Sequence, residues 1–136
     1  MKILIVLTSH TELGNTGKKT GFGIEEFAAL YYVLTDAGAV TTIASPAGKQ
    51  PPVDPKREAT DAQSSTIERF YKDNEVIDKV AYSLRLSEVK PADYDAVFYP
   101  VANGPLWDLA NDNNSIELME DFYNTQKPVA FVCHDG

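Results

Sequence analysis

The chain has 136 residues and carries 12 Lys and Arg against 20 Asp and Glu, a formal charge of −8. This acidic balance argues against nucleic acid or an anionic membrane as a partner. The length suits a single domain, residues 1–136, and 43% apolar residues are enough for a core of ordinary size. The apolar runs are too short to span a bilayer and the one cysteine cannot form an internal disulfide, so we expect a cytoplasmic protein.

The first predicted element is a strand at residues 2–8, an aliphatic run typical of a strand buried on both faces of a parallel sheet. A polar loop follows. Its Gly14 and Gly17 resemble a phosphate-binding loop, but two residues separate them where such a loop needs four, which favours an ordinary loop. Residues 24–37 predict a helix that Gly38 closes. The apolar stripe of this helix is expected to consist of Ile24, Phe27, Ala28, Tyr31 and Leu34.

Glu26 is the unusual residue of this helix. At helical spacing it shares a line with Phe22, Leu30 and Val33, which predicts that it faces an apolar surface. A carboxyl group held against apolar side chains has a raised pKa and can exchange a proton near neutral pH. The other interpretation is a first-turn acid that the helix dipole favours. The pattern alone does not choose between the two.

Predicted strands and helices alternate through the middle of the chain. Residues 40–45 predict a second strand, which completes a right-handed βαβ unit. After a loop with several prolines, residues 64–80 predict one or two short helices. Residues 84–89 are ambiguous, and Pro91 begins a turn. Residues 95–99 predict the third strand.

The last part of the chain repeats this alternation. A short helix is expected to begin near Pro105, and a clear helix is expected from residue 114 to about residue 125. Residues 129–132 predict the final strand. The inward side chains of the clear helix are expected to be Ile116, Met119, Phe122 and Tyr123. Four βα units with apolar strands predict an α/β fold, a doubly wound, mostly parallel sheet with helices on both faces, of flavodoxin-like or Rossmann-like type.

Residues 128–136 carry the strongest functional signal. The final strand leads directly into Cys133, then His134, and then the turn-forming pair Asp135 and Gly136. Strand, nucleophile and tight turn are the parts of a nucleophile elbow, in which a sharp bend exposes a reactive side chain at the carboxyl end of a sheet. A lone cysteine is more often a small buried apolar residue, and its position before a turn favours the reactive interpretation.

Several stretches together carry a resemblance to a known family. They are residues 3–9, 19–22, 24–28, 44–48, 93–100, 104–109 and 129–134. In their residues, order and spacing they resemble the ThiJ/PfpI superfamily, which has the class I glutamine-amidotransferase-like fold. Within it, they are most similar to the branch of heat-shock chaperones and glutathione-independent glyoxalase III. The resemblance extends along the whole chain.

The resemblance implies that Cys133 is the nucleophile, that Glu26 hydrogen-bonds its sulfur, and that His134 is the general base. It implies attack of the thiolate on the aldehyde of methylglyoxal, and conversion of the resulting hemithioacetal to lactate by proton transfers through Glu26 and His134. It further implies a small aldehyde substrate, a homodimer, and neither an organic cofactor nor a metal ion. His10 is assigned to a loop surface.

The sequence departs from the family pattern beside the expected site. Where the family has Gly-Gly-His-Gly, this chain has Val-Ala-Asn-Gly at residues 101–104. Val101 is β-branched and poorly suited to unusual backbone dihedrals. The oxyanion and substrate loop would then consist of Ala102, Asn103 and Gly104. After the Cys-His pair the family has Gly-Pro, whereas Asp135 here would raise the pKa of the thiol by charge repulsion.

The family domain continues beyond the length of this chain, so we expect the sheet to be incomplete at its C-terminal end. Either the chain is the N-terminal part of the family domain, or a partner chain supplies the missing elements. An edge strand without its neighbours would expose apolar surface and unpaired backbone groups.

Two functions of different classes follow from these observations. The first is the glyoxalase III-type enzyme of a stress response, favoured by the set of Glu26, Cys133 and His134. The second is a non-catalytic, chaperone-like or redox-responsive relative that keeps the fold and an oxidisable Cys133, favoured by the altered glycines. A protease or amidohydrolase is a weaker third interpretation, because acyl transfer depends most on the oxyanion hole.

Overall fold

The computed structural model describes residues 1–7, 24–46, 48–49, 65–101 and 113–133. The predicted short helix near Pro105 and the loop with Gly14 and Gly17 lie outside these residues. Of the helices described, none is long and apolar enough to cross a membrane. In chain order the described elements are β1 (Lys2–Val6), α1 (Ile24–Asp36), β2 (Val40–Ser45), α3 (Ser65–Lys72), α4 (Asn74–Ala81), β3 (Leu84–Arg85), the 3-10 turns η1 (Leu86–Glu88) and η2 (Pro91–Asp93), β4 (Ala96–Val101), α6 (Asn113–Asn124) and β5 (Val129–Cys133).

The strands form one sheet in the order β3-β2-β1-β4-β5, and every strand pair is parallel. This order confirms the predicted doubly wound α/β fold. β1 lies at the centre between β2 and β4, and its residues 3–6 are at most 2% exposed. A parallel strand buried on both faces needs apolar side chains at every position, which is why β1 reads as a continuous aliphatic run.

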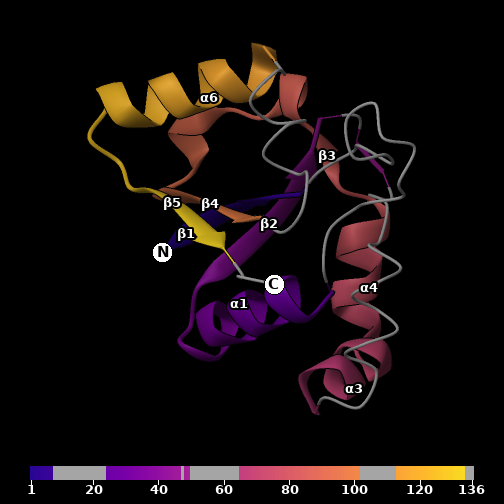
Figure 1. The fold of residues 1–136 in the computed structure, drawn as a ribbon. Coiled ribbons are helices and arrows are strands. Elements are labelled where there is room, and N and C mark those ends of the chain that lie inside the picture. Colours follow the sequence, from indigo (N-terminus) through magenta and orange to yellow (C-terminus); the bar gives the residue numbers. More distant parts are fainter. Residues whose placement is uncertain (8–23, 47, 50–64, 102–112, 134–136) are drawn as a thin grey trace.

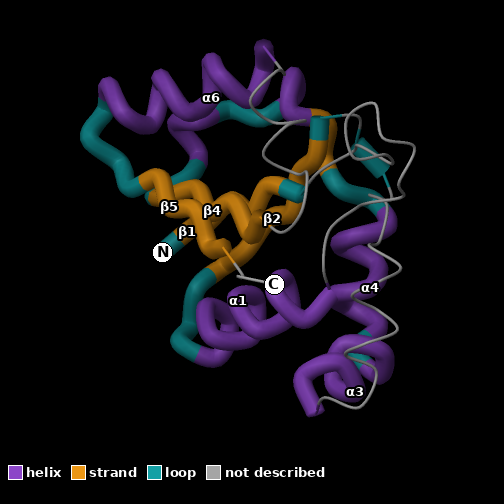
Figure 2. Tube along the Cα trace, viewed as in Figure 1, coloured by secondary structure: helices purple, strands orange, loops and turns teal. Residues whose placement is uncertain are grey.

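Helices cover both faces of this sheet. Figure 1 shows α6 on one side and α1, α3 and α4 on the other, and Figure 2 shows the same three layers by element type. Alternation along β1 assigns its side chains to two separate cores. Ile3 and Ile5 pack with Phe27 of α1 and Val76 of α4. On the other face, the core contains Leu4, Val6, Val97, Tyr99, Leu118 and Phe122.

α1 confirms the predicted helix, including its end. Gly38 adopts a positive φ of 95°, the left-handed conformation that commonly closes a helix, and its N–H donates to the carbonyl of Thr35. The predicted stripe is largely confirmed, because Phe27, Ala28 and Tyr31 are buried. The ring of Phe27 meets the ring of Phe70 in α3 edge to face, with centroids 6.2 Å apart. This contact fixes α3 against α1.

The ambiguous residues 84–89 form a two-residue strand followed by η1. The start of β3 is held by Ser83, whose hydroxyl shares a hydrogen bond of 2.8 Å with Ser45 Oγ and donates to the carbonyl of Lys49. Gly48 has a φ of 75°, and a Cβ built there would lie 3.3 Å from the backbone nitrogen of Arg85. This close approach and the positive φ together favour glycine at position 48.

The predicted orientation of α6 is wrong for two of its four side chains. Phe122 is fully buried and Met119 is half-buried, but Ile116 is 38% exposed and Tyr123 is 81% exposed. The inward line of the helix runs instead through Ser115, Leu118 and Phe122. The two lines lie side by side on the helix and both contain apolar residues, so helical periodicity alone could not choose between them.

The corrected orientation of α6 gives the first testable prediction. Phe122→Ala should lower the free energy of unfolding by about 3–5 kcal/mol, because it empties a buried site between α6 and the sheet. Tyr123→Ala, the adjacent position, should change it by less than about 0.5 kcal/mol. Urea denaturation of both variants beside the unchanged chain measures the difference. Equal destabilisation by the two substitutions would contradict the orientation of α6.

Candidate functional site

The topology marks one edge of the sheet as the place for a site. The connection after β1 leads to α1 on one face, and the connection after β4 leads to α6 on the opposite face. Where the direction of winding reverses between two neighbouring parallel strands, a crevice opens at their carboxyl ends. The reversal in this chain lies between β1 and β4.

The ends of β4 and β5 lie at this carboxyl edge. Cys133 is the last residue of β5, and its backbone is in register with Val101, the last residue of β4. In the described part of the chain, the pairing of β4 with β1 ends earlier, at Phe98. Pro100 follows two residues later and has no N–H to donate to a neighbouring strand. The two strands that flank the reversal therefore stop pairing before the level of Cys133.

Val101 has an ordinary conformation for its residue type. It belongs to β4 and pairs with β5, so its backbone is extended, which suits a β-branched residue. Val101 therefore does not adopt the unusual dihedrals to which a β-branched residue is poorly suited. The remaining residues of the predicted loop, Ala102, Asn103 and Gly104, lie outside the described residues, as do His10, His134 and Asp135.

Glu26 lies in the first turn of α1. This is the position expected for an acid that the helix dipole favours. α1 connects the carboxyl end of β1 to the amino end of β2, so its first turn lies toward the same edge of the sheet as the end of β5. The expected apolar line beyond Glu26 is only partly confirmed, because Leu30 is half-buried but Val33 is 68% exposed. The sequence prediction is wrong for Val33. The buried side of α1 instead includes Tyr32, which is 6% exposed.

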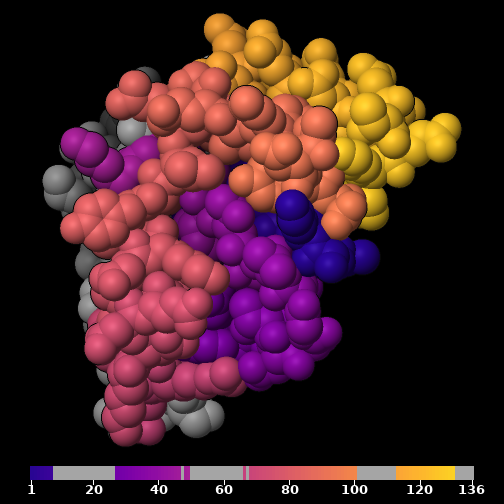
Figure 3. Space-filling model, turned by 180° about the vertical axis from the view of Figure 1, so that it is seen from behind, coloured from indigo at the N-terminus to yellow at the C-terminus, as the bar shows by residue number. Residues whose placement is uncertain are grey.

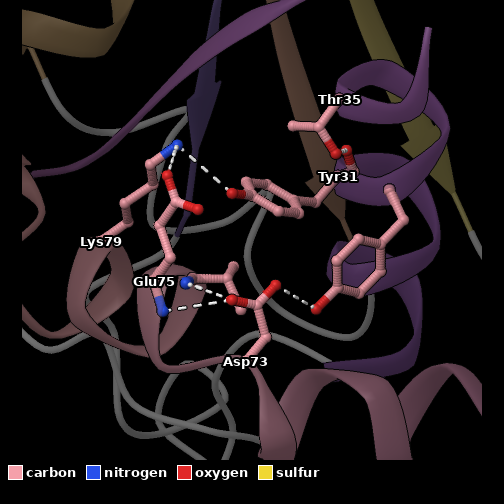
Figure 4. Close-up of polar contacts among 7 residues, drawn as sticks. Tyr31, Thr35, Asp73, Glu75 and Lys79 are labelled. Atoms are coloured by element: carbon pink, nitrogen blue, oxygen red, sulfur yellow. Dashed lines mark hydrogen bonds and ion pairs between the residues drawn. The ribbon is translucent and has the colours of Figure 1, made fainter. Parts of the chain in front are cut away.

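A polar cluster joins α1 to α3 and α4 (Figure 4). Asp73 is the N-cap of α4, and one of its carboxylate oxygens accepts hydrogen bonds from the backbone N–H groups of Glu75 and Val76 at 3.1 and 3.3 Å. Its other oxygen accepts a hydrogen bond of 2.9 Å from the hydroxyl of Tyr32. Lys79 Nζ donates to Tyr31 Oη at 3.3 Å. The sequence signal for Asp73 was available, since it precedes the apolar residues of a predicted helix.

Arg69 completes the contact between α1 and α3. Its guanidinium makes two hydrogen bonds of 2.9 Å to Asp36 and lies 3.7 Å from the centroid of the Tyr32 ring. The hydrogen bonds from Arg69 hold the pKa of Asp36 below its usual value. Burial and the hydrogen bond to Asp73 raise the pKa of Tyr32, so its phenol stays protonated and remains a donor. The contacts of Arg69 and Asp73 with Tyr32 and Asp36 thus hold α3 and the start of α4 in one arrangement against α1.

The described residues contain no group of three or more His, Cys, Asp or Glu that could hold a metal ion.

Comparisons with known proteins found solved structures and curated proteins that are similar to this chain. No family model matches the chain. The chain is similar to Rapid Encystment Protein 24 kDa from Francisella tularensis, with a TM-score of 0.84 and 28% identity, and to glyoxalase III from Candida albicans, with a TM-score of 0.83 and 25% identity. Both alignments cover 98% of this chain, and they cover 58% and 57% of those chains.

Two curated proteins are similar over shorter stretches. Protein/nucleic acid deglycase 2 of Escherichia coli is 39% identical over 49 residues, which are 36% of this chain and 28% of that protein. Protein DJ-1 homolog D of Arabidopsis thaliana is 28% identical over 84 residues, 59% of this chain and 21% of that protein. The doubly wound sheet with its reversal at β1 and β4 makes this an α/β protein with its expected crevice at the carboxyl edge. More closely, the chain is similar to proteins of the DJ-1/ThiJ/PfpI superfamily, and it spans just over half the length of the two solved structures named above.

The pair of Asp36 and Arg69 gives a prediction about pH. The pKa of Asp36 is lower in the folded chain than its ordinary value of 3.8, so the pair adds its full stability at pH values above 3.8. This stability is lost as the pH falls through the lower pKa of the folded chain. Asp36→Asn should therefore reduce the loss of stability on acidification. Urea midpoints at pH 7 and pH 3 measure it, with the exposed acid Asp121→Asn as control. An unchanged acid dependence in Asp36→Asn would contradict the role of the pair.

Proposed function

We propose that this chain takes part in glutathione-independent conversion of methylglyoxal to lactate, with Cys133 as nucleophile. The observation that carries the proposal is the similarity to glyoxalase III from Candida albicans over 98% of this chain. The backbone supports it, because Cys133 ends β5 at the carboxyl edge of the sheet, next to β4, which flanks the reversal of winding. The chain spans 57% of that relative, so the activity belongs to the proposal and not to the comparison.

The proposed chemistry is a balanced internal redox reaction. The Cys133 thiolate adds to the aldehyde carbon of methylglyoxal and gives a hemithioacetal. A base removes the proton from that carbon, the electron pair moves into an enediolate, and protonation of the neighbouring carbon gives a lactoyl thioester. One carbon is thereby oxidised and its neighbour reduced. Water then cleaves the thioester, releasing lactate and restoring the thiol, so the reaction needs no external oxidant or reductant.

The roles of the other groups follow from this sequence of steps. His134 is the general base, and Glu26 holds a proton near the sulfur and exchanges it with the substrate oxygens. Backbone N–H groups of Ala102, Asn103 and Gly104 stabilise the negative oxygen of the enediolate. The substrate is a small aldehyde, the reaction uses neither metal nor organic cofactor, and the protein works in the cytoplasm as a homodimer.

A second candidate activity is removal of early glyoxal adducts from proteins or other nucleophiles. The similarity to protein/nucleic acid deglycase 2 of Escherichia coli over 49 residues favours it. Such adducts exist in equilibrium with free aldehyde, so a thiol that consumes the aldehyde also clears the adduct. Decay of a methylglyoxal adduct of N-acetylcysteine, compared with consumption of free methylglyoxal at equal concentration, separates the two. If the adduct decays faster than it releases free aldehyde on its own, the chain acts directly on the adduct.

Lactate formation from methylglyoxal without glutathione tests the first activity. Cys133→Ser should abolish turnover, because a serine hydroxyl at neutral pH is a far weaker nucleophile than a thiolate. Glu26→Gln keeps the size of the side chain but loses its exchangeable proton, and it should lower kcat by about 10²–10⁴-fold. Tyr82→Phe, exposed at the end of α4, is the control and should retain full activity.

The same assay has a clear contrary outcome. If the unchanged chain forms no more lactate than Cys133→Ser while both show the same cooperative unfolding, the enzymatic proposal is wrong. The chain would then belong to the second class of function, a non-catalytic chaperone-like or redox-responsive relative. Protection of a heat-denatured client protein from aggregation, measured by light scattering, would test that function.

A further inference from the structure

The negative charge of this chain is concentrated in its last part. Residues 1–85 carry ten Lys and Arg against eleven Asp and Glu, whereas residues 86–136 carry two Lys against nine Asp and Glu. Seven of the eight excess negative charges therefore lie in residues 86–136. Figure 3 shows the orange and yellow surface of α6, the described α-helix of this part, at one end of the molecule. The acidic balance thus belongs to one part of the molecule and not to its whole surface.

The acids of α6 are not neutralised by neighbouring lysines or arginines. The helix carries Glu117, Glu120 and Asp121, all exposed, and contains neither Lys nor Arg. Among the residues that the structure describes, no basic side chain forms an ion pair with these three acids. Lys127 follows the helix but is turned inward, because its Nζ donates a hydrogen bond of 3.1 Å to the carbonyl of Pro91. The exposed side of α6 therefore has a negative potential.

A line of apolar side chains lies among these acids. Ile116, Met119 and Tyr123 follow one another at intervals of three and four residues, so they lie on one side of the helix over about 10 Å. Tyr123 is 81% exposed, more than any other large apolar side chain of the described residues. Glu120 follows Ile116 by four positions and borders the line. We call Ile116, Met119, Glu120 and Tyr123 the outer face of α6.

The charge of the outer face determines which partner it fits. A second copy of this chain is a poor match, because two α6 helices in contact would place Glu117 and Glu120 of one beside the same acids of the other. Nucleic acid and anionic lipid are repelled for the same reason. A cationic partner is attracted at a distance, and its apolar side chains can then cover the line that the acids border.

We propose that the outer face of α6 binds a basic amphipathic helix of another protein. One side of such a helix presents apolar side chains at intervals of three and four residues, which match Ile116, Met119 and Tyr123. Lys and Arg beside that apolar side would form charge-assisted hydrogen bonds with Glu117 and Glu120. The contact does not involve Cys133, so the proposal stands whether or not the chain is an enzyme.

Titration of the whole chain with a synthetic peptide tests the proposal. The probe is a peptide of two heptads of Leu and Lys, with its leucines at helical spacing on one side. The backbone amide signals of residues 116–123 should shift in nuclear magnetic resonance spectra and saturate, at constant pH and ionic strength. A second peptide has the same composition and charge, but its residues are ordered so that no apolar side forms. It should bind about tenfold more weakly or less, because it lacks the apolar contact.

Paired variants of the chain locate the contact. Tyr123→Ser removes the most exposed apolar side chain of the outer face, and Glu120→Lys reverses a charge beside it. Each should weaken binding of the first peptide about fivefold or more. The matched controls are Tyr82→Ser at the end of α4 and Glu68→Lys on α3, both at exposed positions. They should leave binding unchanged within about twofold, because a charge outside the contact acts only through screened, long-range attraction.

The proposal fails if the two peptides bind equally, the result expected if net charge alone attracts them. It also fails if the amides of residues 116–123 do not shift and saturate, or if Tyr123→Ser and Glu120→Lys bind as tightly as their controls. Shifts of the same amides that depend on protein concentration without peptide would instead identify a second copy as the partner. Cys133→Ser should bind the first peptide as the unchanged chain does, so this proposal and the enzymatic one fail separately.

Discussion

The arrangement of this chain depends on the parallel pairing of β1 along both of its edges. β1 hydrogen-bonds with β2 on one side and β4 on the other, and its interior is almost wholly excluded from water. A shift of one residue in its register would exchange Ile3 and Ile5 with Leu4 and Val6 between the two cores. Helix packing on both faces therefore fixes the register. The register in turn sets the level at which each neighbouring strand reaches the carboxyl edge.

The parts of the fold that follow from local sequence were predictable. β2 begins and ends at the predicted residues, and Gly38 ends α1 because only a residue tolerant of positive φ fits there. The failures concern choices that only tertiary contacts can make. Tyr123 and Phe122 are adjacent aromatic residues on α6, and the sheet accepts one of them. β3 has two residues, too few for any period, and it forms because Ser45 and Ser83 hold it beside β2.

The same distinction applies to function. Cys133 could be chosen from sequence as a candidate nucleophile because it follows an apolar strand, and the structure confirms that its backbone ends β5. The residue that pairs with Cys133 could not be predicted from sequence, because the register of β4 with β5 is a long-range property. That residue is Val101, which is the last residue of strand β4. The outer face of α6 shows the limit most clearly. The excess of acids in this part of the chain is visible in the sequence, but only the fold shows that Ile116 and Tyr123 lie exposed among them.

α1 connects the two edges of the sheet and so links the geometry at both. Its 13 residues span about 20 Å at the usual rise of an α-helix, from the turn that contains Glu26 to Asp36 at its C-terminal end. Phe27, Ala28 and Tyr31 hold it on the sheet by apolar packing, while Arg69 and Asp73 hold it laterally against α3 and α4. The polar lateral contacts lie in its C-terminal half, on Tyr31, Tyr32 and Asp36, whereas the ring of Phe27 meets Phe70 of α3 close to the first turn. Because a packed helix moves as a unit, these contacts also help to determine where its first turn stands. The position of the first turn of α1 thus depends on the packing of Phe27 beside Glu26 and also on polar contacts further along the same helix.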